Sequence, residues 1–119
     1  MRRMHELSIS SAICDTAVKH AGGRAITRVD VRIGRLRQVV PASLTFCFGL
    51  VAKGTACDGA ELVYEIVPAR LACRDCGHAW EIDVPAFRCP RCASGDAEVV
   101  TGEELEVESI EVEEVECIA

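Results

Sequence analysis

Residues 73–92 read CRDCGHAWEIDVPAFRCPRC, and this stretch decides how the chain is organised. It contains two pairs of cysteines, each with two residues between its members, and twelve residues separate the pairs. Such spacing lets both thiolates of a pair reach one ion, while the hairpin between the pairs brings the second pair opposite the first. The spacing therefore predicts a tetrahedral zinc site made by Cys73, Cys76, Cys89 and Cys92.

Four thiolate ligands leave no open coordination position, so we expect the zinc to be structural and not catalytic. A thioredoxin-like redox site is one alternative, but it would have a single CxxC near a strand-to-helix junction. His78 could take the place of a cysteine, although a polar hairpin residue is the simpler interpretation. The other cysteines are expected in the core (Cys14, Cys47) or as peripheral thiols (Cys57, Cys117).

Two segments before the cysteine pairs have helical spacing. From Leu7 to Ala21 apolar residues recur every three or four positions, and Ser8 is the expected N-cap. A second helix is expected from Pro41, which suits a first helical position, to a stop at Gly54. The stripe expected to be buried on the first helix consists of Ile9, Ala12, Ile13, Thr16, Ala17 and His20.

Three segments alternate between apolar and polar residues, as half-buried strands do. They are residues 28–33, residues 60–67 and the segment after Gly102, whose pattern changes phase and predicts a β-bulge near Ser109. The order is helix, strand, helix, strand, cysteine segment, strand. We therefore expect an α+β fold in which two helices lie on a small three-stranded sheet, with an inserted zinc-ribbon domain. The α/β domain would comprise residues 1–68 and 102–119, and the ribbon residues 69–101.

Composition narrows the function. The chain has 119 residues and a formal net charge of −6, which argues against nucleic acid or an anionic membrane as the main partner. No apolar stretch is long enough to span a bilayer, and no signal peptide is visible, so a cytoplasmic protein is expected.

The glycine-rich stretch 49–55 does not match a phosphate-binding loop, because its lysine precedes the second glycine and should follow it. No catalytic constellation stands out, and we do not expect an enzyme.

The chain resembles the hydrogenase maturation nickel metallochaperones, the HypA/HybF family, over nearly its whole length. The features that carry the resemblance occur in the family's order and surround the zinc ribbon: Met4-His5-Glu6-Leu7-Ser8, Gly34, Val40-Pro41-x-Ser43-Leu44 and Glu108-Ser109-Ile110-Glu111. Two CxxC pairs alone would be shared with many unrelated ribbons. Their combination with the other motifs is specific.

The resemblance implies a nickel metallochaperone with a structural zinc. Nickel would bind at the N-terminal Met-His-Glu, with His5 as the principal ligand and Glu6 as the second residue of the motif. Imidazole with deprotonated backbone amides forms the planar, nitrogen-rich environment that Ni(II) favours. The implied partners are a GTPase and the large subunit of a [NiFe] hydrogenase, or in some organisms the urease maturation system. A homodimer stays an open alternative.

Met1-Arg2-Arg3 precedes the motif here, whereas the family motif normally begins at the initiating methionine. If a terminal amine is a nickel ligand, we expect a chain that starts at Met4 to bind nickel more tightly than this one.

Two functions from other classes compete with this interpretation. A zinc-ribbon adaptor of the transcription or translation machinery would use basic residues on the ribbon, which does contain Arg70, Arg74, Arg88 and Arg91. A redox-sensing zinc protein would release its metal on oxidation. Nickel and zinc stoichiometry would separate the three functions.

Overall fold

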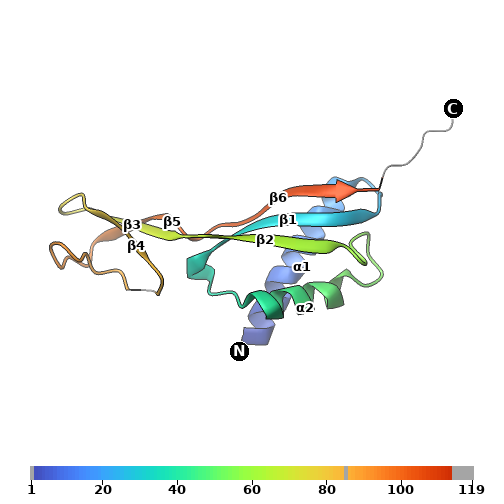
Figure 1. Ribbon diagram of the computed structural model, residues 1–119, viewed down its shortest axis with the longest axis horizontal. Helices are drawn as coiled ribbons and strands as arrows, with labels where there is room; N and C mark the ends of the chain where they lie inside the picture. Colours follow the sequence, from blue (N-terminus) through green and yellow to red (C-terminus); the bar gives the residue numbers. More distant parts are fainter. Residues whose placement is uncertain (1, 85, 114–119) are drawn as a thin grey trace. The chain divides into compact units, whose positions relative to one another are not determined.

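The computed structural model describes the backbone of residues 2–84 and 86–113, and side chains from His5 onward within those ranges (Figure 1). The predicted Cys117 thiol lies outside them. The elements in chain order are α1 (Arg2–Ala21), β1 (Ile26–Gly34), the 3-10 helix η1 (Arg35–Arg37), α2 (Pro41–Ala52), β2 (Glu61–Val67), β3 (Ala69–Cys73), β4 (Ala79–Ile82), β5 (Ala97–Thr101) and β6 (Leu105–Val112). The α+β class with two helices and a three-stranded sheet is confirmed.

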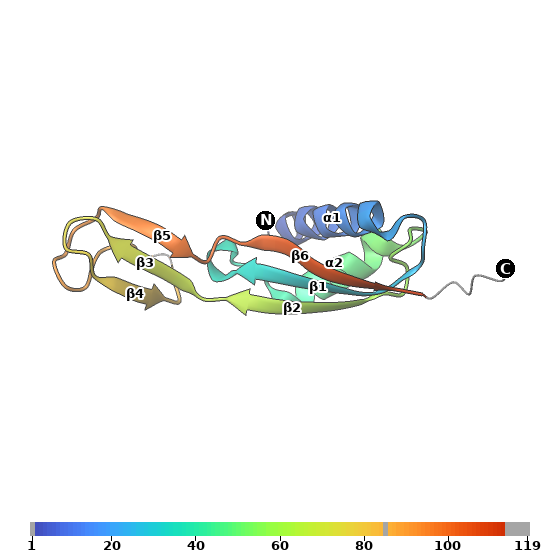
Figure 2. The ribbon, with the colours of Figure 1, turned by 90° about the horizontal axis from the view of Figure 1, so that it is seen from above.

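The first sheet has three strands in the order β2-β1-β6. β1 and β2 run in the same direction and β6 runs against them, and both helices lie on one side of the sheet (Figure 2). Neighbouring parallel strands cannot be joined by a tight turn, so the chain crosses from β1 to β2 through α2. This arrangement buries one face of the sheet under the helices.

The burial of β1 and β6 follows the sequence pattern. On β1, Val29, Val31 and Ile33 are buried. Along β6 the half-buried apolar residues change phase at Glu108–Ser109, where two successive residues are exposed. The predicted change of phase is thus confirmed, and the predicted β-bulge near Ser109 stays a prediction.

Helix α1 begins earlier than predicted. It starts at Arg2, so Ser8 lies inside the helix and the prediction that it is the N-cap was wrong. The buried stripe includes Glu6, one turn before Ile9, so it begins earlier than the predicted helix did. Of the predicted stripe, Ile9, Ile13 and Ala17 are buried, whereas Ala12, Thr16 and His20 are exposed.

Helix α2 packs against α1. Pro41 occupies its first turn, as predicted, and Leu44 and Phe48 are buried. The hydroxyl of Ser10 on α1 donates to the backbone carbonyl of Leu44 over 3.2 Å, and Ser10 is itself buried. A buried hydroxyl needs such a partner, so this bond fixes how the two helices meet.

Three buried thiols lie outside the two cysteine pairs. Cys14 and Cys47 are buried as predicted, but Cys57 is also fully buried, so the prediction of a peripheral thiol was wrong. Burial raises the pKa of Cys57 to about 12. Its backbone N–H donates to the hydroxyl oxygen of Thr55, which also lies 3.5 Å from the Cys14 sulfur. Cys57 therefore behaves as a small core residue.

The cysteine segment forms a second sheet that the sequence patterns did not predict. Its strands have the order β4-β3-β5 and both pairings are antiparallel. Leu71 at the centre of β3 lies opposite Trp80 on one side and Val99 on the other. The register of the β3–β5 pair shifts between Arg70 and Leu71. Cys73 is the last residue of β3, and Cys89 and Cys92 lie in the loop between β4 and β5.

Gly34 is a position where no side chain fits. An added Cβ would lie 2.0 Å from the carbonyl oxygen of Gly102. The backbone N–H groups of Gly34 and Leu36 donate to the carbonyls of Glu104 and Gly102, over 2.7 and 2.9 Å. A glycine is required here because two backbones approach each other closely.

The chain divides into two compact units. Arg32–Gln38 and Ile66–Leu105 form one, here called the ribbon unit, and the rest of the described chain forms the other, here called the helical unit. These units are defined by contacts. The domain boundaries expected from the sequence, which concern what folds independently, stay a prediction.

Candidate metal centres

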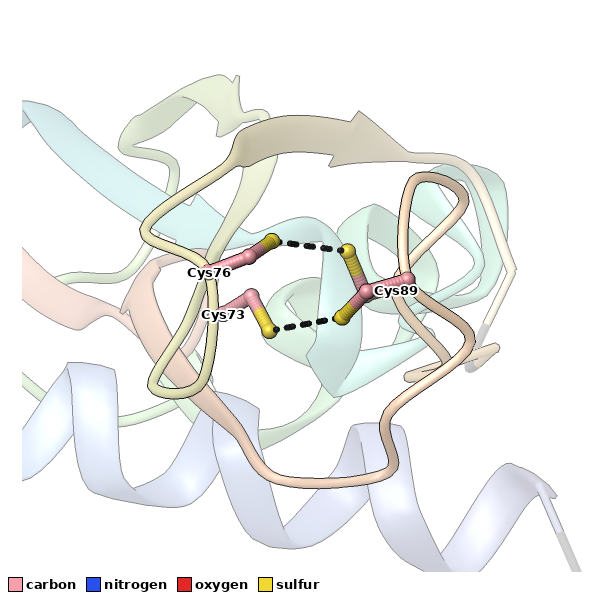
Figure 3. A group of neighbouring side chains, drawn as sticks. Cys73, Cys76 and Cys89 are labelled. Atoms are coloured by element: carbon pink, nitrogen blue, oxygen red, sulfur yellow. Dashed lines mark hydrogen bonds between the residues drawn. The ribbon is translucent and has the colours of Figure 1, made fainter.

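The four cysteines of the predicted zinc site lie together in the ribbon unit. Cys73 ends β3, Cys76 follows in the next turn, and Cys89 faces both of them from the other side of the cluster (Figure 3). The sulfurs of Cys73 and Cys92 are 3.5 Å apart, those of Cys76 and Cys89 are 3.7 Å apart, and all four lie within 4.8 Å of one another. Two thiols from each loop thus point at one centre.

This geometry fits a zinc ion. Four sulfurs at about 2.3 Å from a tetrahedral zinc are about 3.8 Å from one another, close to the spacing between these thiols. The group consists of four cysteines, two buried and two exposed. With four thiolates the coordination sphere is closed, so bound zinc would hold the two loops together and would offer no position to a substrate.

Backbone N–H groups surround the thiols. Burial raises the pKa of Cys89, but the N–H groups of Cys92 and Arg91 donate to its sulfur and, with the neighbouring thiols, lower that pKa to about 7. The N–H of Ser94 donates to Cys92 and favours its thiolate, yet hydrogen bonds from the other thiols and burial raise its pKa to about 12. These amides stabilise negative charge on the sulfurs, which metal ligands require.

His78 does not belong to this cluster. Its ring stacks on Trp80, with ring centroids 5.9 Å apart and an angle of 9° between the planes. The imidazole therefore packs on an aromatic neighbour in the hairpin. This agrees with the simpler interpretation of His78.

The two residues expected at the nickel site lie in the first turns of α1, in the helical unit. His5 is exposed, and Glu6 is fully buried. One oxygen of Glu6, Oε2, accepts a hydrogen bond of 3.4 Å from the backbone N–H of Val40, at the N-terminal end of α2. The other oxygen, Oε1, is buried and has no hydrogen-bond partner among the described residues.

Sequence reasoning missed this position of Glu6. A glutamate near the start of a helix is expected at the surface, and only the packing of α1 on α2 reveals its burial. The signal that could have found it is the helical phase, because Glu6 lies three and four residues before the buried Ile9 and Ser10. A buried carboxylate oxygen without a partner is a ligand atom that an incoming cation could use.

The fold and the thiol cluster together define a class, that of α+β proteins with an inserted ribbon suited to structural zinc. The match to a family model is more specific. Residues 4–112 match the model described as "Hydrogenase/urease nickel incorporation, metallochaperone, hypA". The chain belongs to the HypA family.

Relatives agree with this assignment. The chain is 41% identical to a protein named hydrogenase maturation factor HypA from Desulfosudis oleivorans, over 93% of this chain and 100% of that protein. It is 38% identical to one of the same name from Streptomyces avermitilis, over 93% and 88%. The solution structure of the Ni metallochaperone HypA from Helicobacter pylori superposes with a TM-score of 0.63 at 26% identity, covering 90% of this chain and 96% of that one. Among the described helices, none has the length and apolar character to cross a membrane.

Proposed function

We propose that this protein is a nickel metallochaperone, which binds Ni(II) at the N-terminal end of α1 and delivers it during maturation of a [NiFe] hydrogenase, or of urease. The family match over residues 4–112 carries the proposal. The GTPase partner and the hydrogenase large subunit come from the family resemblance. The protein would act in the cytoplasm, where a cluster of four unpaired thiols stays reduced, and it would not itself be an enzyme.

The proposed nickel ligands are His5 and Glu6. An imidazole and a carboxylate are donors that bind Ni(II), and one of them is exposed at the surface. Glu6 contributes the oxygen that lacks a hydrogen bond within the described chain. Because its side chain is fully buried, that oxygen reaches an ion on His5 only when the first turns of α1 open from α2. Local opening of a helix end costs little, which suits a site that must release its cargo.

The proposed zinc ligands are Cys73, Cys76, Cys89 and Cys92. They share no residue with the nickel site. Zinc at the closed four-thiolate site would stay bound while nickel is taken up and released. The adaptor function has less support, because Arg74 pairs with Asp96 at 2.9 Å and Arg88 donates to the carbonyl of Ala93. These two guanidinium groups serve contacts within the ribbon.

Calorimetric titration with Ni(II) at pH 7.5 tests the nickel site. His5→Ala should abolish tight nickel binding, because it removes the exposed member of the proposed ligand pair. The matched control is His20→Ala, which removes the exposed histidine at the other end of the same helix and should leave nickel affinity unchanged. Glu6→Gln should weaken binding by less than His5→Ala does. Unchanged nickel affinity in His5→Ala would refute the assignment.

A further inference from the structure

A second set of contacts joins the two cysteine loops without using sulfur. Asp75 lies between the cysteines of the first pair, and Ser94 lies two residues after the second pair. The hydroxyl of Ser94 donates a hydrogen bond to Oδ2 of Asp75. One side chain from each loop thus meets the other beside the thiol cluster.

Ser94 also contacts both cysteines of the second pair. Its carbonyl accepts the backbone N–H of Cys89 over 2.9 Å, and its own N–H donates to the Cys92 sulfur. Its hydroxyl oxygen accepts the N–H of Asp96 over 3.1 Å. The position of the Ser94 side chain is therefore linked to the positions of two thiols.

A neighbouring pair of residues bridges the same two loops. The backbone N–H of Arg74 donates to the carbonyl of Asp96 over 2.9 Å. The Arg74 guanidinium donates to the Asp96 carboxylate over 2.9 Å and to the carbonyl of Ala97 over 3.4 Å. These bonds keep the first loop aligned with the segment that follows the second loop.

We propose that Ser94 and Asp75 are positioning residues of the metal centre, and we call their contact the Ser94–Asp75 clasp. The proposal rests on the proposed zinc site. Among the described residues from Ala72 to Thr101, Cys73 and Cys89 alone are buried, so apolar packing does little to hold the loops together. The clasp brings the two loops into register before the ion arrives, and less ordering then opposes metal binding.

The test is a zinc affinity measurement on the full-length chain by competition with a chelator at fixed pH. Ser94→Ala and Asp75→Ala should each weaken zinc binding by about tenfold, the scale expected for residues that orient metal ligands. The double variant should bind zinc about as tightly as the single variant with the lower affinity, because both substitutions remove the same hydrogen bond. Ser94→Thr and Asp75→Asn keep a donor and an acceptor, and should stay close to wild type.

The chain offers a matched control in the helical unit. There the hydroxyl of Ser109 donates to Oδ2 of Asp30 over 3.1 Å, and Ser109→Ala removes a bond of the same type. Zinc affinity should not change in this variant. With Co(II) in place of zinc, the Ser94→Ala variant should keep the absorption of a tetrahedral four-thiolate site, because its ligands are the same.

Three results would overturn the inference. The clasp is refuted if Ser94→Ala and Asp75→Ala bind zinc as tightly as wild type does. It is refuted equally if Ser109→Ala weakens zinc binding to the same degree, since the effect would then not be local. A wild-type chain that binds no zinc would instead refute the proposed zinc site, and the clasp with it.

Discussion

The helical unit and the ribbon unit are stabilised by different means. The helical unit has an apolar core, whose members include Ile13, Val29, Leu44 and Phe48. In the ribbon unit, the described residues from Ala72 to Thr101, which carry both cysteine pairs, have two buried members, Cys73 and Cys89. A zinc ion would therefore take the place of an apolar core around the cysteine loops, while apolar packing suffices in the helical unit.

The two proposed metal sites differ in the same way. The thiols converge from two loops and form a closed set, which suits an ion that stays. His5 is exposed near the start of a helix, and Glu6 next to it in the chain is buried with one oxygen that has no hydrogen bond among the described residues, which suits an ion that is exchanged. The zinc ion that is retained and the nickel ion that is released would thus bind to separate units.

The largest expected effect is the unfolding of one unit while the other stays folded. Replacing Cys73 with Ala should cause loss of zinc and unfold the ribbon unit, because metal binding contributes on the order of 10–16 kcal/mol in small zinc modules. The helical unit should stay folded, since its buried residues do not include the cysteine pairs. Hydrogen exchange measured by mass spectrometry should show fast exchange at residues 69–101 and protection in α1 and α2. Global loss of protection would show that the units do not fold independently.

A substitution in the core of the helical unit should destabilise that unit and leave the metal centre of the ribbon unit intact. Leu44 is fully buried on α2, and Leu44→Ala should lower the free energy of unfolding of the helical unit by about 2–5 kcal/mol. Zinc affinity should not change. Leu50→Ala is the control on the same helix, because Leu50 is 46% exposed and its loss should cost about 0.5 kcal/mol or less. Urea unfolding followed by circular dichroism measures both variants. Weaker zinc binding in Leu44→Ala would contradict the statement that the two units are stabilised independently.

A smaller effect is expected at the surface of the helical unit. The Arg28 guanidinium donates to the Asp30 carboxylate over 2.8 Å and lowers the pKa of Asp30. A carboxyl whose pKa is lowered in the folded state stabilises that state above its unfolded-state pKa of about 3.9, and the stabilisation is lost as pH falls through the folded-state value. Asp30→Asn should therefore lower the melting temperature of the helical unit slightly at pH 7. The difference from wild type should disappear near pH 2; a difference that persists there would assign the effect to another cause.

Much of this architecture could be predicted from local patterns. The cysteine spacing indicated the zinc site, because two short CxxC pairs determine which thiols can meet. The alternation on β1 and the phase change at Glu108–Ser109 indicated half-buried strands. These features are encoded within a few neighbouring residues, and such patterns are readable without tertiary contacts.

The rest depends on contacts between distant residues. Glu6 is buried because α1 packs beside Val40, which lies 34 residues away. Cys57 is buried next to Thr55 and Cys14, and no periodic pattern marks its position. The clasp joins two side chains 19 residues apart, and the pairing of Cys73 with Ala97 on β3 and β5 brings their loops together. The helical phase could have indicated the burial of Glu6, but none of the three contacts names its distant partner in the local sequence.

The central claim is that two metals bind separate ligand sets, and metal content measured in the same samples tests it most directly. Wild-type protein, His5→Ala and Cys92→Ala, each purified without a metal-binding tag and equilibrated with nickel and zinc, are analysed by inductively coupled plasma mass spectrometry. We predict that His5→Ala loses nickel and keeps zinc, and that Cys92→Ala loses zinc and keeps nickel. Loss of both metals in His5→Ala, or unchanged nickel content in that variant, would contradict the account.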